Sequence, residues 1–239
     1  MTAQNRRWLI VGDSGTGKST TAREVAALYV PRKKRILVLS MFPDWGEWVR
    51  KWKGVWIRAT RESVGRLDWE AVLSFRRAFV EFVGWAQEDV RVALDRLALL
   101  VWKGAVDQGL IVLDEAHLFL PLHGASREFE RLILGIRHRG GDLVFISQAP
   151  QRLSMPAREQ ANAIVAHRLS SEAAMEHLFR VAPELEAYRR DLQRLEVGER
   201  FLVDVERKET WFIPRHGRPR RVGVSIGGEG WRSTNTAHT

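Results

Sequence analysis

Short apolar runs recur along the chain, separated by polar and charged segments. Each run is continuous rather than alternating, which is typical of strands buried on both faces of a sheet. The runs cover residues 8–11, 36–39, 110–113 and 143–146, with a weaker one at 163–166. Segments with helical spacing lie between several of them. This alternation predicts an α/β fold with a doubly wound, mainly parallel sheet.

Five segments have apolar residues at the spacing of amphipathic helices. We predict helices over residues 18–29, 69–83, 87–103, 126–136 and 172–180. Pro31 should end the first of them, and Asp68 is a suitable N-cap for the second.

The pattern changes after about residue 195. Residues 201–205 and 210–213 flank a charged turn, which predicts an antiparallel hairpin at the edge of the sheet. Residues 215–239 hold five arginines and one glutamate among small and polar residues. We therefore expect one domain over residues 1–214 and a basic, flexible C-terminal tail over 215–239.

Composition narrows the classes of protein that remain. The 239 residues fit one α/β domain, and the absence of cysteine excludes disulfides, thiolate metal sites and a cysteine nucleophile. No apolar run approaches the ~18 residues that span a bilayer, so we expect no transmembrane segment and an intracellular location. The net charge of +9 favours polyanionic partners such as nucleic acid.

A phosphate-binding loop follows the first predicted strand directly. It has the complete pattern G-x-x-x-x-G-K-S, in the strand–loop–helix context that this motif requires. Its glycines let backbone N–H groups turn towards phosphate oxygens, and the helix N-terminus adds partial positive charge. We expect Lys18 to reach the β- and γ-phosphates and Ser19 to ligate Mg²⁺. The nucleotide-binding residues are Gly12, Asp13, Ser14, Gly15, Thr16, Gly17, Lys18, Ser19 and Thr20.

An acidic pair follows the third strong strand. Asp114 comes after four apolar residues, as in a Walker B strand, and would hold Mg²⁺ or its water. Glu115 can polarise a water for attack on the γ-phosphate, which a kinase does not need. The pair therefore favours a hydrolase over a transferase. Residues 114–117 also spell the DEAH box of some helicases, but those enzymes need two ATPase lobes, so we expect His117 to be a packed or capping residue.

Two further positions can complete the chemistry. Gln148 follows the 143–146 strand, where ligands bind in open α/β sheets, and could bond the γ-phosphate or the attacking water. Arg137 and Arg139 precede that strand and are candidates for a cation delivered to the nucleotide of a neighbouring subunit. A solvated, basic helix end is the alternative interpretation of these arginines.

Together these motifs resemble the HerA/FtsK superfamily of DNA-translocating ATPases, over about residues 8–213. The resemblance includes the phosphate-binding loop and the acidic pair. In addition, residues 137–153 are similar to the family's arginine turn, sensor strand and following loop. Residues 43–48 and 195–199 are similar to its D-x-x-G-E-aromatic and L-x-x-G-E segments. The resemblance implies a RecA-like ATPase of the ASCE class. By this resemblance, Lys18 and Ser19 would bind MgATP, Asp114 would hold Mg²⁺ and Glu115 would be the base. Gln148 would be the sensor, and Arg137 the trans finger that reaches the nucleotide of a neighbouring subunit.

The first predicted strand starts at residue 8, so we expect no N-terminal β-barrel of the HerA type. In size and layout the chain resembles the packaging ATPases of membrane-containing double-stranded DNA viruses. The resemblance implies a ring, hexameric or pentameric, that moves double-stranded DNA with capsid vertex or portal partners. Such a protein would work in the host cytoplasm, or associated with the virion. The zonula-occludens-toxin-like assembly proteins of filamentous phages are also similar around Arg137–Gln148, but they usually carry a transmembrane segment. The alternatives are a HerA-like cellular or plasmid translocase acting with a nuclease or conjugation partner, and a P-loop switch without motor activity.

Two sets of residues have less certain roles. Residues 32–35, residues 50–53 and Arg215, Arg218, Arg220 and Arg221 of the tail could contact DNA phosphates. A solvated basic turn is slightly favoured for residues 32–35, and a solubilising end is an equally good interpretation of the tail. Trp45, Trp48, Trp52 and Trp56 would share one helix face if a helix extended that far. Because duplex DNA hides its bases, we expect these tryptophans in the core or at a subunit interface.

Overall fold

The computed structural model describes residues 6–32, 34–104 and 108–222. Their strands form one sheet with the order β10-β9-β8-β7-β1-β6-β5-β2-β4-β3. From β7 to β3 all neighbours are parallel, and β8, β9 and β10 continue the sheet in antiparallel fashion. The strands are β1 (Arg7–Val11), β2 (Ile36–Ser40), β3 (Val55–Thr60), β4 (Arg77–Val83), β5 (Leu110–Leu113), β6 (Asp142–Ser147), β7 (Ala163–Ala166), β8 (Arg200–Asp204), β9 (Glu209–Ile213) and β10 (Arg220–Val222).

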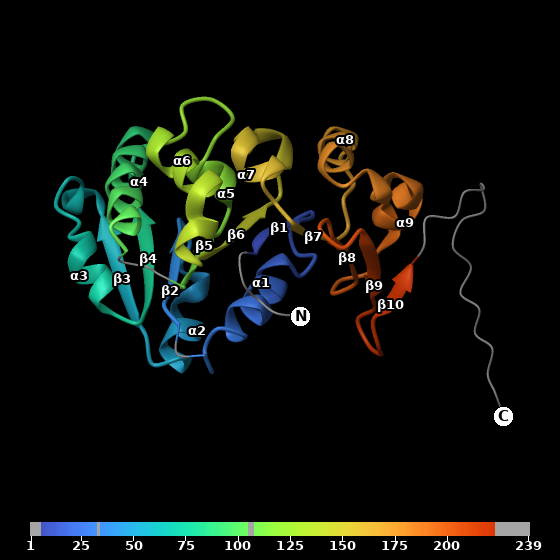
Figure 1. Ribbon diagram of the computed structural model, residues 1–239, viewed down its shortest axis with the longest axis horizontal. Helices are drawn as coiled ribbons and strands as arrows, with labels where there is room; N and C mark the ends of the chain where they lie inside the picture. The colour runs from blue at the N-terminus through green and yellow to red at the C-terminus, as the bar shows by residue number, and fades with distance from the viewer. Residues whose placement is uncertain (1–5, 33, 105–107, 223–239) are drawn as a thin grey trace.

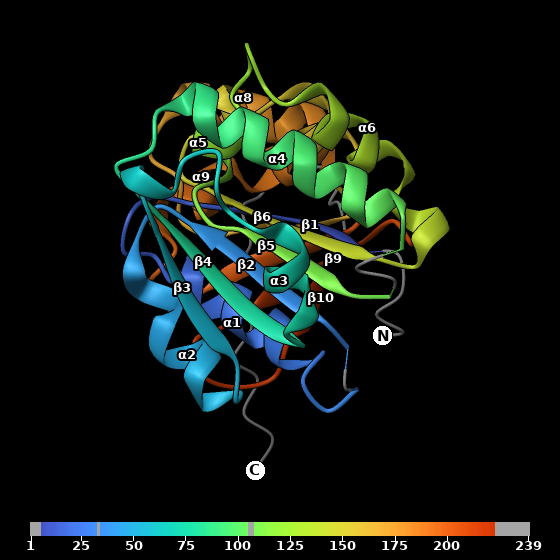
Figure 2. The same ribbon diagram turned by 90° about the vertical axis from the view of Figure 1, so that its left-hand side faces the viewer.

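Helices cover both faces of this sheet. Figure 1 shows α4 to α8 above the sheet and α1 and α2 below it, and Figure 2 shows the same two layers from the end, with the sheet twisted between them. The helices are α1 (Lys18–Ala27), α2 (Gly46–Lys51), α3 (Trp69–Ser74), α4 (Gln87–Trp102), α5 (Ala116–Phe119), α6 (Arg127–Gly135), α7 (Met155–Glu159), α8 (Glu172–Val181) and α9 (Arg189–Arg194). The predicted α/β class with a doubly wound, mainly parallel sheet is confirmed.

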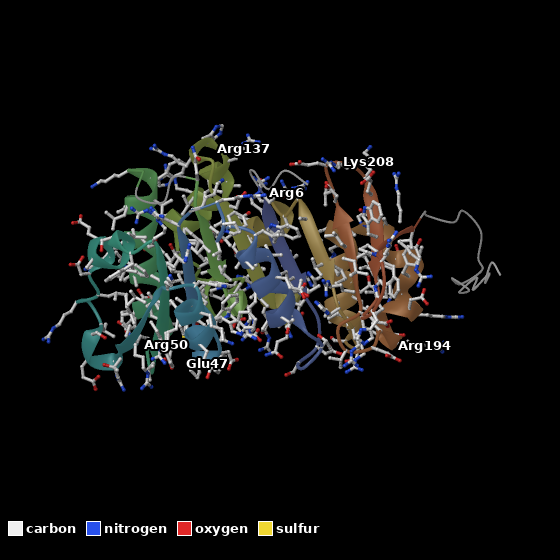
Figure 3. All side chains as sticks on the ribbon, turned by 90° about the horizontal axis from the view of Figure 1, so that it is seen from below. Arg6, Glu47, Arg50, Arg137, Arg194 and Lys208 are labelled. Atoms are coloured by element: carbon white, nitrogen blue, oxygen red, sulfur yellow. The ribbon has the colours of Figure 1, made fainter. Side chains whose placement is uncertain are left out.

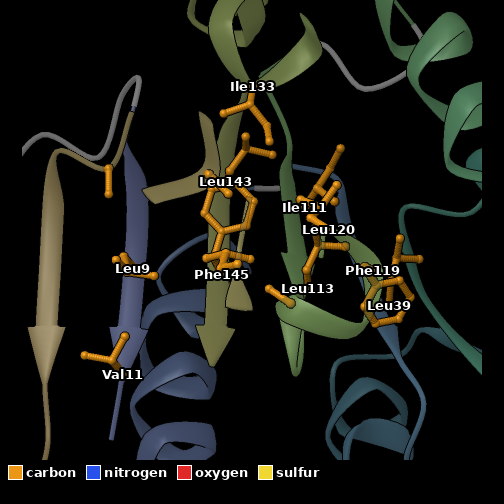
Figure 4. Close-up of a cluster of buried hydrophobic side chains, with 14 of the residues drawn as sticks. Leu9, Val11, Leu39, Ile111, Leu113, Phe119, Leu120, Ile133, Leu143 and Phe145 are labelled. Atoms are coloured by element: carbon orange, nitrogen blue, oxygen red, sulfur yellow. The ribbon is translucent and has the colours of Figure 1, made fainter. Parts of the chain in front are cut away.

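The central strands are apolar throughout because each face of the sheet has its own core. On β1, Leu9 and Val11 belong to the core under α3 to α9, whereas Trp8 and Ile10 belong to the core against α1 and α2. Figure 4 shows Leu9 and Val11 on β1, Phe145 on the adjacent β6, and Leu113 one strand further on β5. A strand buried on both sides has no polar positions, which is why these runs could be found in the sequence.

All five strands predicted from continuous apolar runs are present, and most of the predicted helices are too. Ser126 and Asp68 cap α6 and α3 as N-caps, accepting hydrogen bonds from Phe129 N and Ala71 N. The predicted helix over 69–83 is wrong beyond Ser74: Phe75 is extended, and 77–83 form β4. The chain there is rich in aromatic and β-branched residues and is buried on both faces, which favours a strand.

The C-terminal hairpin is confirmed as β8 and β9, but β10 forms the edge of the sheet. Arg220–Val222 pair with β9, so the segment assigned to a flexible tail begins with ordered structure. A three-residue strand is too short to have shown an apolar run in the sequence. Residues 223–239, the rest of the predicted tail, lie outside the described residues.

Candidate active site

The phosphate-binding loop joins the carboxyl end of β1 to the start of α1. A side chain at Gly12 would place its Cβ 2.6 Å from His167 Cβ and 2.8 Å from Thr16 Oγ1, so this position needs glycine. Gly17 is the N-cap of α1 in the left-handed conformation, and no side chain caps the helix. The amides of the first turn are therefore open to an anion, as the phosphate-binding motif requires.

The segment after β7 and the turn before β8 hold this loop in place. Asp13 N donates to the carbonyl of Arg168 at 2.8 Å, and Asp13 Oδ2 accepts from Ser170 N at 3.0 Å. Gly198 N donates to the carbonyl of Thr16 at 3.1 Å. The exit of β7 and the turn before β8 therefore fix the loop from outside its own motif. Ser14, Gly15 and Thr20 remain exposed, and Ser19 is half-buried at the start of α1.

Lys18 is buried and lies between the loop and the acidic pair. Its Nζ donates to the carbonyl of Asp13 at 2.8 Å. Burial lowers the pKa of Lys18, against the opposing effect of Glu115 and Asp114. The charged amine is thus incompletely compensated within the protein, as expected for a group that meets phosphate oxygens.

Asp114 continues β5 at the carboxyl edge, where its N–H donates to the Leu39 carbonyl at 2.9 Å. The residue is 4% exposed, and Trp45 Nε1 donates to Oδ2 at 2.9 Å. Burial raises the pKa of Asp114, and the bond from Trp45 partly opposes this. Sequence analysis did not identify Trp45 as a partner of Asp114.

Glu115 sits in the left-handed region, with φ 52°. Its Oε2 lies 3.4 Å from Gln148 N and 3.4 Å from His117 Nδ1, and the same imidazole nitrogen is 3.1 Å from Ser147 Oγ. Burial raises the pKa of Glu115, and Lys18 is the main opposing charge. The structure therefore brings the expected base, Glu115, close to the main chain of the expected sensor, Gln148. His117 lies between Glu115 and Ser147 at the end of β6.

Gln148 reaches this site through its main chain. Its side chain is exposed and has no hydrogen-bond partner within residues 6–32, 34–104 and 108–222. The amide is available to a ligand, and its role as a sensor stays a prediction.

The donor set at this edge fits Mg²⁺. No group of three or more acidic, histidine or cysteine residues that could hold a metal occurs among the described residues. Mg²⁺ with a nucleotide does not require one, because it keeps several waters and takes one or two protein oxygens plus phosphates. The hydroxyl of Ser19 and the carboxylate of Asp114 are hard oxygen donors of the right kind.

Arg137 lies at the opposite edge of the sheet. It belongs to a short 3₁₀ turn, Ile136–Arg139, just before β6 begins, and it is exposed. Figure 3 shows Arg137 on the same edge as Arg6 and Lys208, with Glu47 and Arg194 on the other. Arg137 has no hydrogen-bond or ion-pair partner in the described part of the chain. Arg139, the other candidate, donates through Nη2 to the carbonyl of Trp102, the last residue of α4. Its guanidinium therefore already has a partner within the protein.

His167, at the exit of β7, is a buried residue that sequence analysis missed. Its side chain is 0% exposed, and Nε2 lies 2.9 Å from Thr21 Oγ1 on α1. Nδ1 is buried with no hydrogen-bond partner among the described atoms. Burial, with the nearby charges of Arg200 and Lys18, lowers the pKa of His167 to about 4. The imidazole is therefore neutral at physiological pH, and no motif in the sequence marked it.

The tryptophans do not share one helix. Helix α2 ends at Lys51, and Trp56 lies on β3, where it stacks on Phe79 with ring centroids 5.9 Å apart. Trp45 is fully buried and Trp48 is 37% exposed. The expected core role is confirmed for Trp45, whereas Trp52 and Trp56 are partly buried and pack against the same core. Among the candidate DNA contacts, Lys33 lies outside the described residues, and the structure does not test the others.

Comparisons with known proteins agree with this architecture. A sequence comparison with curated proteins finds no match. The fold is similar to the genome packaging NTPase B204 of Sulfolobus turreted icosahedral virus 2 in complex with AMP (TM-score 0.66, 14% identity, 86% of this chain and 96% of that chain). It is similar to the DNA-packaging ATPase B204 of Sulfolobus turreted icosahedral virus (0.66, 17%, 87% and 97%). It is equally similar to VirB4 of Thermoanaerobacter pseudethanolicus (0.66, 14%, 90% and 90%).

At these identities the similarity is one of fold alone, and that fold is the α/β architecture expected from the sequence. Among the described residues, no helix combines the length and apolar character needed to cross a membrane.

The family model for zonular occludens toxin (Zot) matches residues 70–197, just over half of the chain. The matched part contains the acidic pair, Arg137 and Gln148 but not the phosphate-binding loop. The chain belongs to the Zot family.

Proposed function

We propose that this protein hydrolyses ATP with Mg²⁺ at the carboxyl edge of the sheet. The observation that carries the proposal is the convergence of Lys18, Asp114 and Glu115 at the carboxyl ends of β1 and β5. Lys18 and the open first turn of α1 would bind the phosphates, and Asp114 with Ser19 would hold the metal. Glu115 would accept a proton from the attacking water. Gln148 is the group at the end of β6 that we expect to contact the γ-phosphate.

The active form in this proposal is a homo-oligomeric ring, hexameric or pentameric. Arg137 cannot serve its own nucleotide site, because it lies at the other edge of the sheet. In a head-to-tail ring it would approach the neighbour's γ-phosphate as a trans finger. Exposed apolar side chains around the nucleotide edge support a subunit contact there. They are Phe42, Leu122, Met155 and Val197, which are 47%, 40%, 53% and 49% exposed.

The work that we propose for this ring is the translocation of double-stranded DNA, most specifically the packaging of a viral genome. The net charge of +9 supports a polyanionic track, and the fold that the chain shares with B204 supports the packaging role. Capsid vertex or portal proteins would be the partners, in the host cytoplasm or at the virion. The equal similarity to VirB4 supports a second candidate, a HerA-like cellular or plasmid translocase acting with a nuclease or conjugation partner.

The test is ATP turnover by the purified full chain, alone and with long linear double-stranded DNA, with single-stranded DNA of the same length as a comparison. Glu115→Gln is the blank, because it keeps the size and hydrogen bonding of the side chain but removes the base. Strong stimulation by duplex DNA, abolished in the variant, is the expected result. Slow turnover that ignores both DNAs would favour a nucleotide switch without motor activity and would overturn the translocase proposal.

A further inference from the structure

The segment that follows β2 contributes a buried donor to the metal side of the nucleotide site. Trp45 is the last residue of the short 3₁₀ turn Pro43–Trp45 and is fully buried. Its indole nitrogen donates to Oδ2 of Asp114 at 2.9 Å, and Asp114 is itself only 4% exposed. A buried carboxylate held by this bond and by the main-chain N–H of Glu115 has little freedom to rotate. With Oδ2 engaged by Trp45, Oδ1 is the oxygen that we expect to face a metal or its water.

The same segment is tied to the helix that carries the other expected metal ligand. Arg23 lies four residues after Ser19 and therefore on the same side of α1. Its guanidinium lies 5.5 Å from the ring centroid of Trp45 and 5.4 Å from that of Trp48. Arg23 Nη2 also donates to the carbonyl of Asp44 at 2.8 Å. One arginine thus connects the Ser19 side of α1 to the residue that holds Asp114.

Packing on the far side makes the position of Trp45 rigid. Its ring meets Trp52 edge-on, with centroids 6.4 Å apart. The next residue, Gly46, lies so close to the ring of Trp56 that a Cβ there would collide with it. The glycine therefore lets the first turn of α2 pack directly on β3. This contact gives a physical reason for glycine at position 46.

We infer that Trp45 is a positioning residue for the metal carboxylate: its indole N–H orients Asp114 for Mg²⁺, and Arg23 keeps Trp45 in place from α1. The inference rests on the proposed nucleotide site but adds a group from outside the phosphate-binding and acidic motifs. Residues that orient metal ligands in this way typically change metal affinity or activity about 10- to 100-fold when they are removed. A tryptophan that only filled the core would change stability and leave the metal dependence unaltered.

The experiment compares wild type with Trp45→Phe, which keeps an aromatic ring for Arg23 and Trp52 but lacks the N–H. Binding of a fluorescent, non-hydrolysable ATP analogue is titrated with Mg²⁺, and separately measured in EDTA. We expect the Mg²⁺ concentration at half-saturation to rise about tenfold or more in the variant. Affinity in EDTA should not change, because the phosphate-binding loop is untouched. Trp48→Phe, at a partly exposed ring that does not touch Asp114, is the matched control and should keep the wild-type Mg²⁺ curve.

Equal losses of affinity with and without Mg²⁺ would overturn the inference and assign Trp45 a structural role. So would an unchanged Mg²⁺ midpoint. If Trp45→Phe does not fold, Arg23→Met tests the same link without altering Trp45, and the Mg²⁺ midpoint should move in the same direction. Failure of the wild type to bind the analogue at all would overturn the proposed function itself, and is distinguished by the first titration.

Discussion

Lys18 Nζ donates a hydrogen bond to the main-chain carbonyl of Asp13, 2.8 Å away. The phosphate-binding loop therefore closes on its own lysine. The same carbonyl also accepts from Thr16 Oγ1 at 2.8 Å, so it is the acceptor at the centre of the loop. Lys18 is buried, and burial lowers its pKa. A ligand phosphate would offer this amine stronger acceptors than a carbonyl, and binding would relieve the cost of burying a charge.

Removing the amine should therefore weaken nucleotide binding. A charge-assisted hydrogen bond contributes ~1.5–3 kcal/mol, so Lys18→Ala should lower the affinity for MgATP by about tenfold or more. In the wild type, affinity should fall as the pH rises through the pKa of Lys18. Because burial lowers that pKa, the fall should begin at a lower pH than for an ordinary lysine. Calorimetric titration measures both effects. Lys51→Ala, at an exposed lysine over Trp48, should bind like the wild type.

Two inactive variants should restore each other if Arg137 acts on the neighbouring subunit. Arg137→Ala and Glu115→Gln should each reduce ATP turnover strongly, by about 10³-fold for a lost arginine finger. In a 1:1 mixture, about a quarter of the interfaces join an intact Glu115 to an intact Arg137, because a head-to-tail contact uses different surfaces of the two subunits. Turnover by the mixture should clearly exceed that of either variant alone.

The control for this mixture is Arg139→Ala, because Arg139 is bonded to the carbonyl at the end of α4. We expect that variant to keep turnover and to lose thermal stability. A mixture no more active than its components, measured where both variants form rings, would show that Arg137 does not act in trans.

His117 should affect the rate of hydrolysis more than the binding of ATP. Its Nδ1 lies within 3.4 Å of Glu115 Oε2 and 3.1 Å of Ser147 Oγ. His117→Ala removes this support, and a displaced base typically costs up to about 100-fold in rate. We expect kcat to fall while KM stays close to the wild-type value. His117→Gln, which can still donate a hydrogen bond, should recover part of kcat, and His123→Ala at an exposed position should change neither constant. A parallel change in KM would indicate a general packing defect instead.

The five strands predicted from continuous apolar runs are buried on both faces, and β8 and β9 were predicted from the charged turn between them. β3 and β4 were missed for different reasons. In β4 the apolar residues follow those of α3 without an intervening glycine or proline, so one helical period seemed to run through Phe75. In β3 only Ala59 is fully buried, and the strand lies at the edge of the sheet. Local spacing cannot separate such segments, because tertiary burial decides between helix and strand.

The candidate site likewise contains residues that the sequence reveals and contacts that it does not. Within each of the two motifs the residues are close together in the sequence, so Lys18, Asp114 and Glu115 could be identified from their local spacing alone. The Trp45–Asp114 bond joins residues 69 positions apart, and the Thr21–His167 bond joins residues 146 apart. Each exists because strands distant in sequence are neighbours in the sheet. Without the strand order, neither partner carries a local signal.

His167 should make the stability of the protein depend on pH in the acidic range. Burial lowers its pKa to about 4 in the folded protein, from an ordinary value of 6.5. Between these values the unfolded chain binds a proton that the folded protein does not, so the free energy of unfolding should fall as the pH falls from about 6.5 to about 4. For this group alone the loss amounts to ~3 kcal/mol at the acidic end.

Urea unfolding across this pH range measures the effect as the difference between wild type and His167→Gln. The glutamine can still reach Thr21 but does not titrate, so the variant should lack this component of the pH dependence, whatever constant offset its packing adds. His138→Gln, which changes an exposed histidine at the other edge of the sheet, should retain the wild-type curve. Parallel curves for wild type and His167→Gln would mean that the imidazole takes up its proton without loss of the folded state. The buried, neutral histidine beneath the phosphate-binding loop would then not be a source of acid sensitivity.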